Sequence, residues 1–515
     1  MRPTPSSINA SALPVLALAA LSACSDVHRE AESDIPAHFR DFAAQFERER
    51  QALGIPGAAV AILERGELTF ARGFGTKSVD GREPVDADTI FRTGSMGKLA
   101  TAIGVMSAVD DGLLELDAPV REAIPDLSLE GPEADALTLR QLLSQQSGLS
   151  DYLEVDASSE DAALAEFAAG PGLAENVGFI NPPGAFWNYS NPNYYIAGRA
   201  LEAQANVPYR QALDERVFSP LGMDRSFLLP SDVLADGNYS NGYGSNDERG
   251  EGPLEDLAPD AYDNAWARPA GFAFSNVRDW AKLMQFTMYG DDSVLSEAAH
   301  AEVVSSQVST HTIYADVQAT ALGLGDDYGL GVGVSQGFFM DHRADPETYY
   351  PVPVLGHGGD IPGFATTFAV LPSTGFGIVV LSNRDAARPV DSIRLALTSF
   401  GELPPPSPPP PGNAVDPSRF ASYAGTFVAR DGGTVEVSAS DGQVTLESAL
   451  IDALGLPYEP VLEPTSLDNF ALWVTLGEQR FPLEVTFLAD ESGEFGWFRS
   501  RIAVARRATG GAVAP

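Results

Sequence analysis

The chain has 515 residues, a length that predicts about two to four domains, and 44% of the residues are hydrophobic, enough to build buried cores. Acidic residues number 71 against 32 basic ones, giving a formal net charge of −39. This charge argues against nucleic acid or anionic lipid headgroups as electrostatic partners. Lysine occurs only at Lys77, Lys98 and Lys282, and every other basic residue is arginine.

The N-terminus carries an apolar run from Ala12 to Ala23, too short to span a bilayer comfortably and typical of a secretory signal. The run ends in LSAC, and Cys24 is the only cysteine, which excludes an internal disulfide. LSAC resembles the lipobox of bacterial lipoproteins. That resemblance implies a signal peptide over residues 1–23 and a lipid anchor at Cys24 in the cell envelope, periplasmic or on the outer surface. A chance cysteine in an ordinary signal peptide is the alternative.

Beyond a spacer at 24–37, the pattern predicts one large domain over residues 38–402. An amphipathic stretch is followed by two strands that turn near Arg65 and Gly66. From Ser95 to about Met288 the pattern is mainly helical, and strand signals then return between residues 328 and 383. The two ends of this domain therefore predict one antiparallel sheet with a helical insert between them, covered by a helix near 386–400.

A proline-rich segment, residues 403–413, interrupts this pattern with seven prolines in eight positions. Such a run cannot donate the hydrogen bonds of a helix or a sheet, so it predicts a stiff linker. Residues 414–508 then alternate apolar and polar side chains with glycine-containing turns. They predict a small all-β domain, followed by a tail at 509–515.

The stretch FRTGSMGK, residues 91–98, places Ser95 three positions before Lys98. The apolar spacing that follows predicts a helix ending near Gly112, on which the serine hydroxyl and the lysine amine share a face. A desolvated lysine can lose its proton and act as a base, whereas arginine stays protonated. Ser-x-x-Lys is therefore the spacing of an activated serine, although a helix cap beside a solvated lysine has the same spacing.

A second group, FWNYSNPNYYIAG at residues 186–198, places Tyr189 and Asn191 in a segment whose prolines favour a loop. A tyrosine hydroxyl here could relay a proton to or from Ser95. The asparagine amide could hold a substrate carbonyl or the amine of Lys98. Aromatic packing is the competing interpretation, because several rings crowd the same segment.

A third group, GHGGDIPGF at residues 356–364, opens a predicted strand. None of the six histidines, His357 included, has a partner at metal-ligand spacing, so the sequence predicts no metal site. The glycines beside His357 would let a substrate approach the backbone closely. A catalytic role and a hydrogen-bonded turn are equally compatible with this histidine alone.

Together the three groups resemble the serine β-lactamase and penicillin-binding-protein superfamily, most closely its class C β-lactamase-like branch. That branch includes β-lactamases, D-alanyl-D-alanine carboxypeptidases, D-aminopeptidases and family VIII esterases. The resemblance covers about residues 38–400 and includes TLRQLLSQQSGL, VFSPLGMDRSF and ARPAGFAFSNVRDWAKLM. It implies an α+β fold, an antiparallel sheet flanked by helices with a large helical insert. Residues 414–508 resemble the small lipocalin-like β domain often appended to such hydrolases, and we predict no catalytic residue there.

The resemblance implies a role for each residue of the first two groups. Ser95 would be the nucleophile, Lys98 its base or base partner, and Tyr189 the proton relay. Asn191 would orient the tyrosine or the substrate. QQSG, residues 145–148, stands where relatives commonly carry His-Thr-Ser-Gly, and the sequence offers no interpretation of this departure.

In the third group, His357, Gly358 and Gly359 stand where a β-lactamase carries Lys-Thr-Gly, and the backbone amides of Ser95 and Asp360 would form the oxyanion hole. Lysine offers a fixed cation to a substrate carboxylate. A histidine with an ordinary pKa near 6.5 would be only about a quarter charged at pH 7. We therefore expect short-chain esters or uncharged amides to be better substrates than penicillins or cephalosporins.

These inferences predict a lipid-anchored serine hydrolase that uses no cofactor and acts on an ester, amide or peptide. The alternative is a non-catalytic envelope protein that retains the pocket to bind or sense cell-wall fragments. Intact Ser95, Lys98 and Tyr189 argue against this alternative. The sequence assigns neither a base for deacylation nor an oligomeric state.

Overall fold

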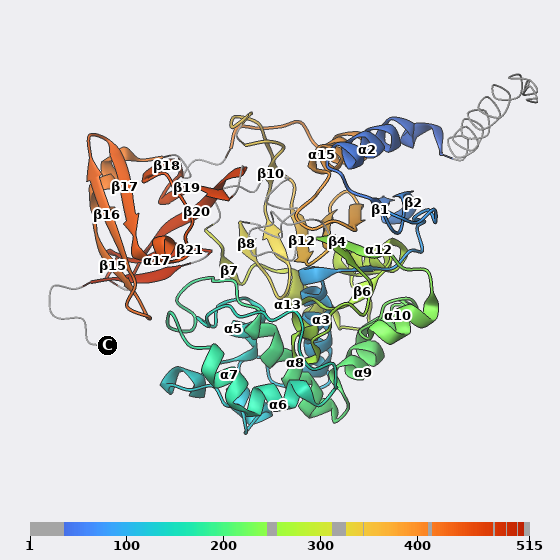
Figure 1. The fold of residues 1–515 in the computed structure, drawn as a ribbon, viewed down its shortest axis with the longest axis horizontal. Helices are drawn as coiled ribbons and strands as arrows, with labels where there is room; N and C mark the ends of the chain where they lie inside the picture. Colours follow the sequence, from blue (N-terminus) through green and yellow to red (C-terminus); the bar gives the residue numbers. More distant parts are fainter. Residues whose placement is uncertain are drawn as a thin grey trace, which may run out of the picture.

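The computed structural model describes residues 35–244, 255–311, 326–342, 344–409, 415–476, 479–490, 492–501 and 503–508. A sheet with its helices forms one body, and a β-barrel lies beside it (Figure 1). The predicted signal peptide, Cys24 and the tail lie outside the described residues. Within the described ranges, no helix combines the length and the apolar character that crossing a membrane would require.

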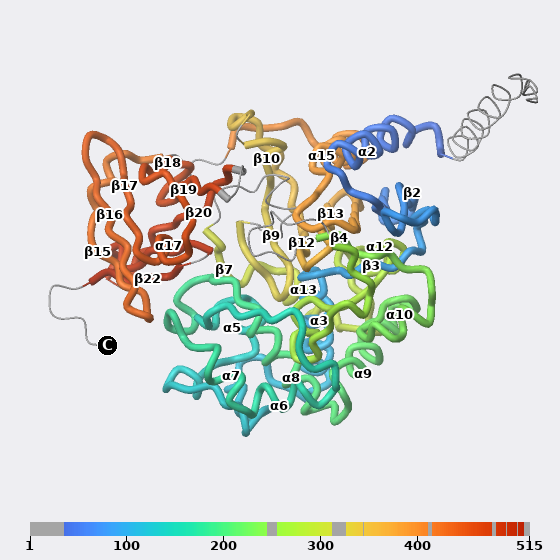
Figure 2. The backbone as a smooth tube through the Cα atoms, viewed as in Figure 1, coloured from blue at the N-terminus to red at the C-terminus, as the bar shows by residue number. Residues whose placement is uncertain are grey.

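One antiparallel sheet organises the first body, and both ends of the domain contribute strands to it, as the sequence predicted. In order across the sheet, its strands are β2 (Glu67–Gly75), β1 (Gly57–Glu64), β14 (Phe376–Ser382), β13 (Phe364–Leu371), β12 (Val354–Ile361), β9 (Gly333–Ser335), β8 (Asp327–Tyr328) and β7 (Val308–Ser309). Figure 2 shows the early strands, in blue, beside the late ones, in orange. Strands β1 and β2 turn at Arg65 and Gly66, both with positive φ.

Helices cover both faces of this sheet, which explains why β1 is a nearly continuous apolar run. They are α2 (Arg40–Ala52) and α15 (Val390–Phe400) on one face and α12 (Val277–Tyr289) on the other. Alternate side chains of a strand point to opposite faces, so Val60 and Ile62 join the core under α2 and α15, while Ala61 and Leu63 join the core under α12. Each fully buried Val, Ile or Leu side chain contributes about 1.5–3 kcal/mol.

The helical insert lies below the sheet in Figure 1 and is built around α3 (Gly97–Asp110). Residues 97–108 are buried on every side of this helix, because it passes between the sheet and its neighbours. The remaining helices of the insert are α4 (Val120–Ala123), α5 (Leu139–Leu143), α6 (Ala163–Ala169), α7 (Pro171–Asn176), α8 (Pro192–Ala205), α9 (Tyr209–Leu213), α10 (Pro230–Asp236), α11 (Arg268–Gly271) and α13 (Glu297–Val304).

The predicted all-β domain is a closed barrel. Its strands are β15 (Gly425–Ala429), β16 (Thr434–Ser440), β17 (Gln443–Ser448), β18 (Val461–Ser466), β19 (Asn469–Leu476), β20 (Gln479–Ala489), β21 (Phe495–Ser500) and β22 (Val504–Arg507). Inward-facing side chains such as Phe427, Val435 and Phe487 fill its interior. Closure leaves no unpaired edge among these strands.

Residues 403–409, the described part of the proline-rich linker, contact the first body. Ser407 and Tyr349 exchange backbone hydrogen bonds of 2.8 and 3.0 Å, so the linker adds a short bridge to β11 (Tyr349–Tyr350). The barrel also packs directly on the helical insert. The rings of Phe186 and Trp497 meet with centroids 5.5 Å apart, and Leu488 and Val504 complete this apolar seam.

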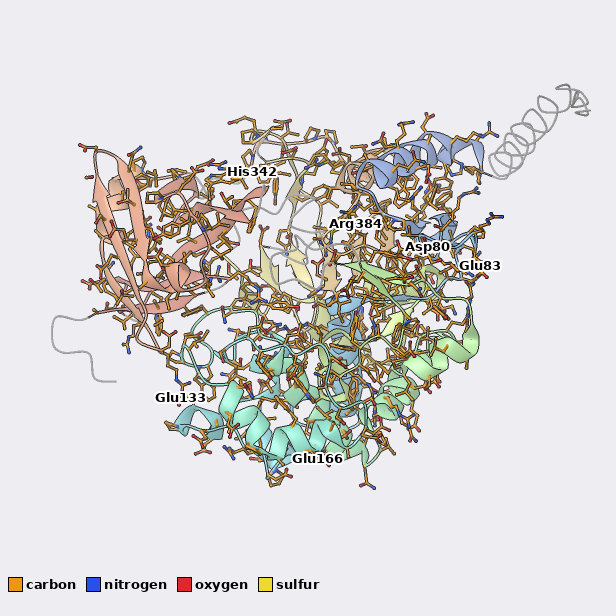
Figure 3. The ribbon with its side chains drawn as sticks, in the orientation of Figure 1. Asp80, Glu83, Glu133, Glu166, His342 and Arg384 are labelled. Atoms are coloured by element: carbon orange, nitrogen blue, oxygen red, sulfur yellow. The ribbon has the colours of Figure 1, made fainter. Side chains whose placement is uncertain are left out.

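The excess of negative charge lies on the periphery. Figure 3 labels Asp80 and Glu83 at one edge of the first body and Glu166 on the helical insert, and all three side chains are exposed. Solvated carboxylates at such positions keep a protein soluble and repel polyanions, while contributing little to the fold.

Phe186→Ala tests the importance of the seam between barrel and insert. Removing this buried ring leaves a cavity, and we expect the free energy of unfolding to fall by about 3 kcal/mol. Calorimetric or circular-dichroism melting measures the change. Leu454→Ala is the control because Leu454 is 58% exposed, and it should change stability by at most about 0.5 kcal/mol. Equal effects of the two substitutions would contradict a stabilising seam.

Candidate active site

Ser95 lies where the sheet meets the central helix. Strand β3 (Phe91–Arg92) leads into the 3₁₀ turn η2 (Gly94–Met96), and α3 begins directly after it. Gly94 has φ +54, in the left-handed region that glycine adopts without steric cost. The half-buried Ser95 has its Oγ 3.1 Å from Nζ of Lys98, one helical turn later. The structure thus brings these two residues together.

The amine of Lys98 is removed from water, since the residue is 0% exposed. Besides the serine hydroxyl, its Nζ contacts Oδ1 of Asn191 and the carbonyl oxygen of Ala270, each at 2.7 Å. Burial is the largest effect and lowers the pKa of Lys98 to about 7, with Asp151 raising this pKa and Arg501 lowering it.

This pKa makes the lysine a suitable base. A neutral amine has two N–H donors and one lone pair. The oxygens of Asn191 and Ala270 only accept, so they take both N–H groups and leave the lone pair facing the hydroxyl of Ser95. Neutral and charged forms of Lys98 coexist near pH 7, and the neutral form is placed to take the serine proton.

Tyr189 approaches Ser95 from the loop before α8, and their hydroxyls share a hydrogen bond. Burial raises the pKa of the Tyr189 phenol well above its usual range, more than the bond to Ser95 lowers it. The phenol therefore stays protonated at neutral pH. Of the two groups beside the serine, Lys98 is the better base and Tyr189 is a proton donor.

Asn191 is held in one orientation by Asp151. One carboxylate oxygen, Oδ1, accepts from both the side-chain Nδ2 and the backbone N of Asn191, at 3.0 and 2.8 Å. Because a carboxylate only accepts, Nδ2 must face Asp151 and Oδ1 must face the amine of Lys98. The structure therefore places Asn191 beside the lysine.

Gln145 holds the loop that carries Tyr189 and Asn191 through hydrogen bonds of its side chain. It is the first residue of QQSG and adopts φ 62. Its Oε1 accepts from the backbone N of Ser190 at 2.9 Å and from Nδ2 of Asn193 at 2.5 Å. These bonds hold the segment that carries Tyr189 in place. QQSG therefore has a structural role, which the sequence alone did not indicate.

Strand β12 forms the opposite wall and passes very close to the serine turn. A Cβ on Gly359 would lie 2.2 Å from the carbonyl oxygen of Thr93 and 3.0 Å from the backbone N of Ser95. Only glycine fits there. The hydroxyl of Thr366 on β13 reinforces this contact by donating to the carbonyl of Thr93 at 2.7 Å.

The register of β12 directs the amide of Asp360 into the same space. A two-residue turn makes Ile361 and Phe364 the first hydrogen-bonded pair of the β12–β13 hairpin. The next pair is not hydrogen-bonded, so the N–H of Asp360 points away from β13. It can therefore act with the nearby N–H of Ser95 on a negative oxygen. The side chain of Asp360 pairs instead with Arg388 at 2.6 Å.

His357 is 1% exposed, and both of its ring nitrogens are engaged. Its Nδ1 donates to the carbonyl of Gly358 at 2.6 Å, so its Nε2 accepts from the hydroxyl of Tyr328 at 3.0 Å. Burial is the main cause that lowers the pKa of His357 to about 3, and Lys98 lowers it further. The expectation of a quarter-charged imidazole is wrong, because the sequence alone did not reveal this burial.

A cavity of about 1040 Å³ lies between part of the helical insert and part of the barrel, next to this site. The insert contributes Asp151 and Tyr189 to its lining, and the barrel contributes Arg430, Leu450 and Arg501. Sequence reasoning missed Asp151 and Arg501. A polar residue close after QQSG was the only available signal for Asp151, and nothing pointed to Arg501.

Comparisons with known proteins identify the family and the fold. The Beta-lactamase family profile matches residues 42–399. Penicillin-binding protein 4 of Amycolatopsis lactamdurans is 27% identical over 77% of this chain and 98% of its own length. A D-aminopeptidase of Cereibacter sphaeroides is 26% identical over 69% of this chain and 62% of its own length. A penicillin-binding protein homologue from Pyrococcus abyssi shares the fold, with TM-score 0.58 and 21% identity over 90% of this chain and 99% of its own.

The fold and the site thus define a serine hydrolase of the β-lactamase superfamily. The chain belongs to the Beta-lactamase family, whose profile covers most of its length.

Lys98→Arg tests the assignment of the base. Arginine keeps the charge but cannot give up its proton, so kcat/KM for p-nitrophenyl butyrate should fall about 10²–10⁴-fold. Lys77→Arg is the matched control, because this lysine pairs with Glu83 on the surface. If the Lys98→Arg variant kept more than a tenth of the wild-type kcat/KM, the assignment of Lys98 as the base would fail.

The pH dependence of the wild-type enzyme is a second test of the base. Its kcat/KM should rise about tenfold from pH 6 to pH 8, since Lys98 loses its proton near pH 7.

Proposed function

We propose that the protein hydrolyses an ester, amide or peptide through an acyl-enzyme on Ser95. The observation that carries this proposal is the water-excluded amine of Lys98, whose Nζ lies 3.1 Å from the Ser95 hydroxyl while oxygens of Asn191 and Ala270 accept its N–H groups. A serine beside a neutral base is an activated nucleophile.

In acylation, neutral Lys98 takes the Ser95 proton while Oγ bonds to the substrate carbonyl carbon. The carbonyl oxygen becomes an oxyanion, which the N–H groups of Ser95 and Asp360 stabilise. When the bond to the leaving group breaks, the phenol of Tyr189 donates its proton to that group and regains one from the Lys98 ammonium. The enzyme keeps the acyl group as an ester of Ser95.

Deacylation reverses these roles with water as the nucleophile. Water adds to the acyl carbon, its proton passes to the site, and the bond to Oγ breaks as Ser95 is reprotonated. The group that the structure offers for this proton is the neutral amine of Lys98, reached directly or through the hydroxyl of Tyr189, which passes its own proton on as it takes one from water. The carboxylate of Asp151 is already occupied by Asn191 and Arg501.

For the substrate class, we infer a preference for short-chain esters and uncharged amides over β-lactams. Neutral His357, at the position where β-lactamases have a lysine, supports this preference because it offers no cation to a substrate carboxylate. The charge-assisted bond that it lacks is worth about 1.5–3 kcal/mol.

Parallel assays with nitrocefin and p-nitrophenyl butyrate test this preference. We expect a higher kcat/KM for the ester. His357→Gln, a neutral replacement, should change both values together and leave their ratio within about threefold, since no charge is lost. A selective fall of tenfold or more in nitrocefin turnover would show that His357 carries a charge after all.

A non-catalytic sensor is the competing function. A fluorophosphonate probe separates the two, because it bonds covalently only to an activated serine. Stoichiometric labelling of the wild type, abolished in Ser95→Ala, supports the hydrolase. An unlabelled wild type would favour the sensor.

We also propose that Cys24 carries a lipid that anchors the protein in the bacterial cell envelope. The support is the LSAC sequence, with its single cysteine, after an apolar run.

Expression in a bacterium that processes lipoproteins tests the anchor. Wild type should partition into detergent and take up labelled palmitate. Cys24→Ser should do neither, and a chain starting at Asp26 should be soluble and active. Wild-type protein that purifies without lipid and without detergent would rule out the anchor.

A further inference from the structure

Two arginines of the barrel hold the segment that carries Tyr189. Arg499, near the end of β21, donates to the carbonyl of Trp187 at 2.9 Å, and Arg501 donates to the carbonyl of Tyr189 at 3.4 Å. Arg499 and Arg501, two positions apart on the barrel, therefore bind two loop residues that are also two positions apart, Trp187 and Tyr189. The guanidinium of Arg501 also lies 5.0 Å from the ring centroid of Tyr189.

Arg501 also begins a chain of contacts that ends at the lysine. Its Nη2 pairs with Oδ2 of Asp151 at 2.6 Å. The other carboxylate oxygen of Asp151 accepts from both N–H groups of Asn191, whose Oδ1 contacts Nζ of Lys98 at 2.7 Å. Each link has an assigned donor and acceptor, so the orientation of the barrel arginine is transmitted to the amine.

The charges along this chain oppose one another. The carboxylate of Asp151 favours the ammonium form of Lys98, whereas the guanidinium of Arg501 opposes that form. Arg501 is 48% exposed and Asp151 is 26% exposed, so solvent and salt weaken their effect but do not remove it.

We propose that Arg501 is a positioning residue that the barrel supplies to the hydrolase site. By pairing with Asp151 it orients Asn191 toward Lys98 and offsets the negative charge that would otherwise hold a proton on the base. This proposal rests on the proposed role of Lys98, and it makes the barrel part of the catalytic apparatus.

Three ionisable side chains around the lysine, Tyr189, Tyr194 and His357, stay neutral between pH 5.5 and 9.5. Burial holds the pKa values of Tyr189 and Tyr194 above this range, and it lowers the pKa of His357 to about 3. The remaining charged neighbours, Asp360 and Arg388, are paired with each other at 2.6 Å. A change in the pKa of Lys98 on substitution of Asp151 or Arg501 therefore reflects the charge of the substituted residue.

The test is the pH dependence of Ser95 labelling by the fluorophosphonate probe, from pH 5.5 to 9.5. In the wild type the midpoint should lie near 7. Arg501→Gln should raise the midpoint by about 0.5–1 pH unit, slowing labelling about three- to tenfold at pH 6 and little at pH 9.5. Asp151→Asn should move the midpoint in the opposite direction, and the double variant should return it toward the wild-type value.

Arg499→Gln is the matched control, because Arg499 holds the same segment but bonds to Trp187 and Thr310. It should slow labelling equally at every pH without moving the midpoint. The same uniform loss in Arg501→Gln would reduce Arg501 to a structural contact and overturn the proposal.

If Arg501→Gln does not fold, Asp151→Asn and Arg501→Lys complete the test. Arg501→Lys keeps the charge and should hold the midpoint within about 0.3 unit. A midpoint that does not move in Asp151→Asn overturns the proposal. Failure of the proposed function would look different: the wild type would not label at any pH, or Ser95→Ala would label as fast as the wild type.

Discussion

The burial of the Lys98 amine is the constraint on which the site depends. A cation without water is unstable in a protein interior, so the amine must lose its proton or be surrounded by oxygen. Here the oxygens come from three separate segments: Ser95 on the turn before α3, Asn191 on the loop before α8, and Ala270 on α11. The packing of these segments around the buried α3 keeps water out, and that exclusion lowers the pKa of Lys98 to about 7, so that its neutral, basic form is populated at neutral pH.

The opposite wall of the site, strand β12, is fixed by a steric constraint. Strand β12 approaches the serine turn so closely that neither Gly94 nor Gly359 has room for a side chain. This proximity brings the backbone amides of Ser95 and Asp360 into one small volume, at the edge of a sheet that helices cover on both faces. A rigid sheet keeps such donors in place without reorganisation, which is what stabilisation of a developing oxyanion requires.

Local patterns sufficed to predict the strands at both ends of the first domain, the all-β character of residues 414–508 and the Ser95–Lys98 spacing, since each depends on residues close together in the sequence. They could not predict Asp151 and Arg501, which lie 350 residues apart in the sequence and meet only in the tertiary structure. Nor could they predict the electrostatics of His357. Its identity was visible, but its complete burial and its bond to Tyr328 depend on the tertiary structure.

The long separation between Asp151 and Arg501 has a consequence for biosynthesis. A ribosome that has completed the sheet and the helical insert has not yet made Arg501, because the barrel follows them in the chain. Contacts between residues so distant in sequence form late in folding. A nascent chain would therefore contain Ser95 and Lys98 in place while the base still lacked the partner from the barrel, so full reactivity would come only after the whole molecule had assembled.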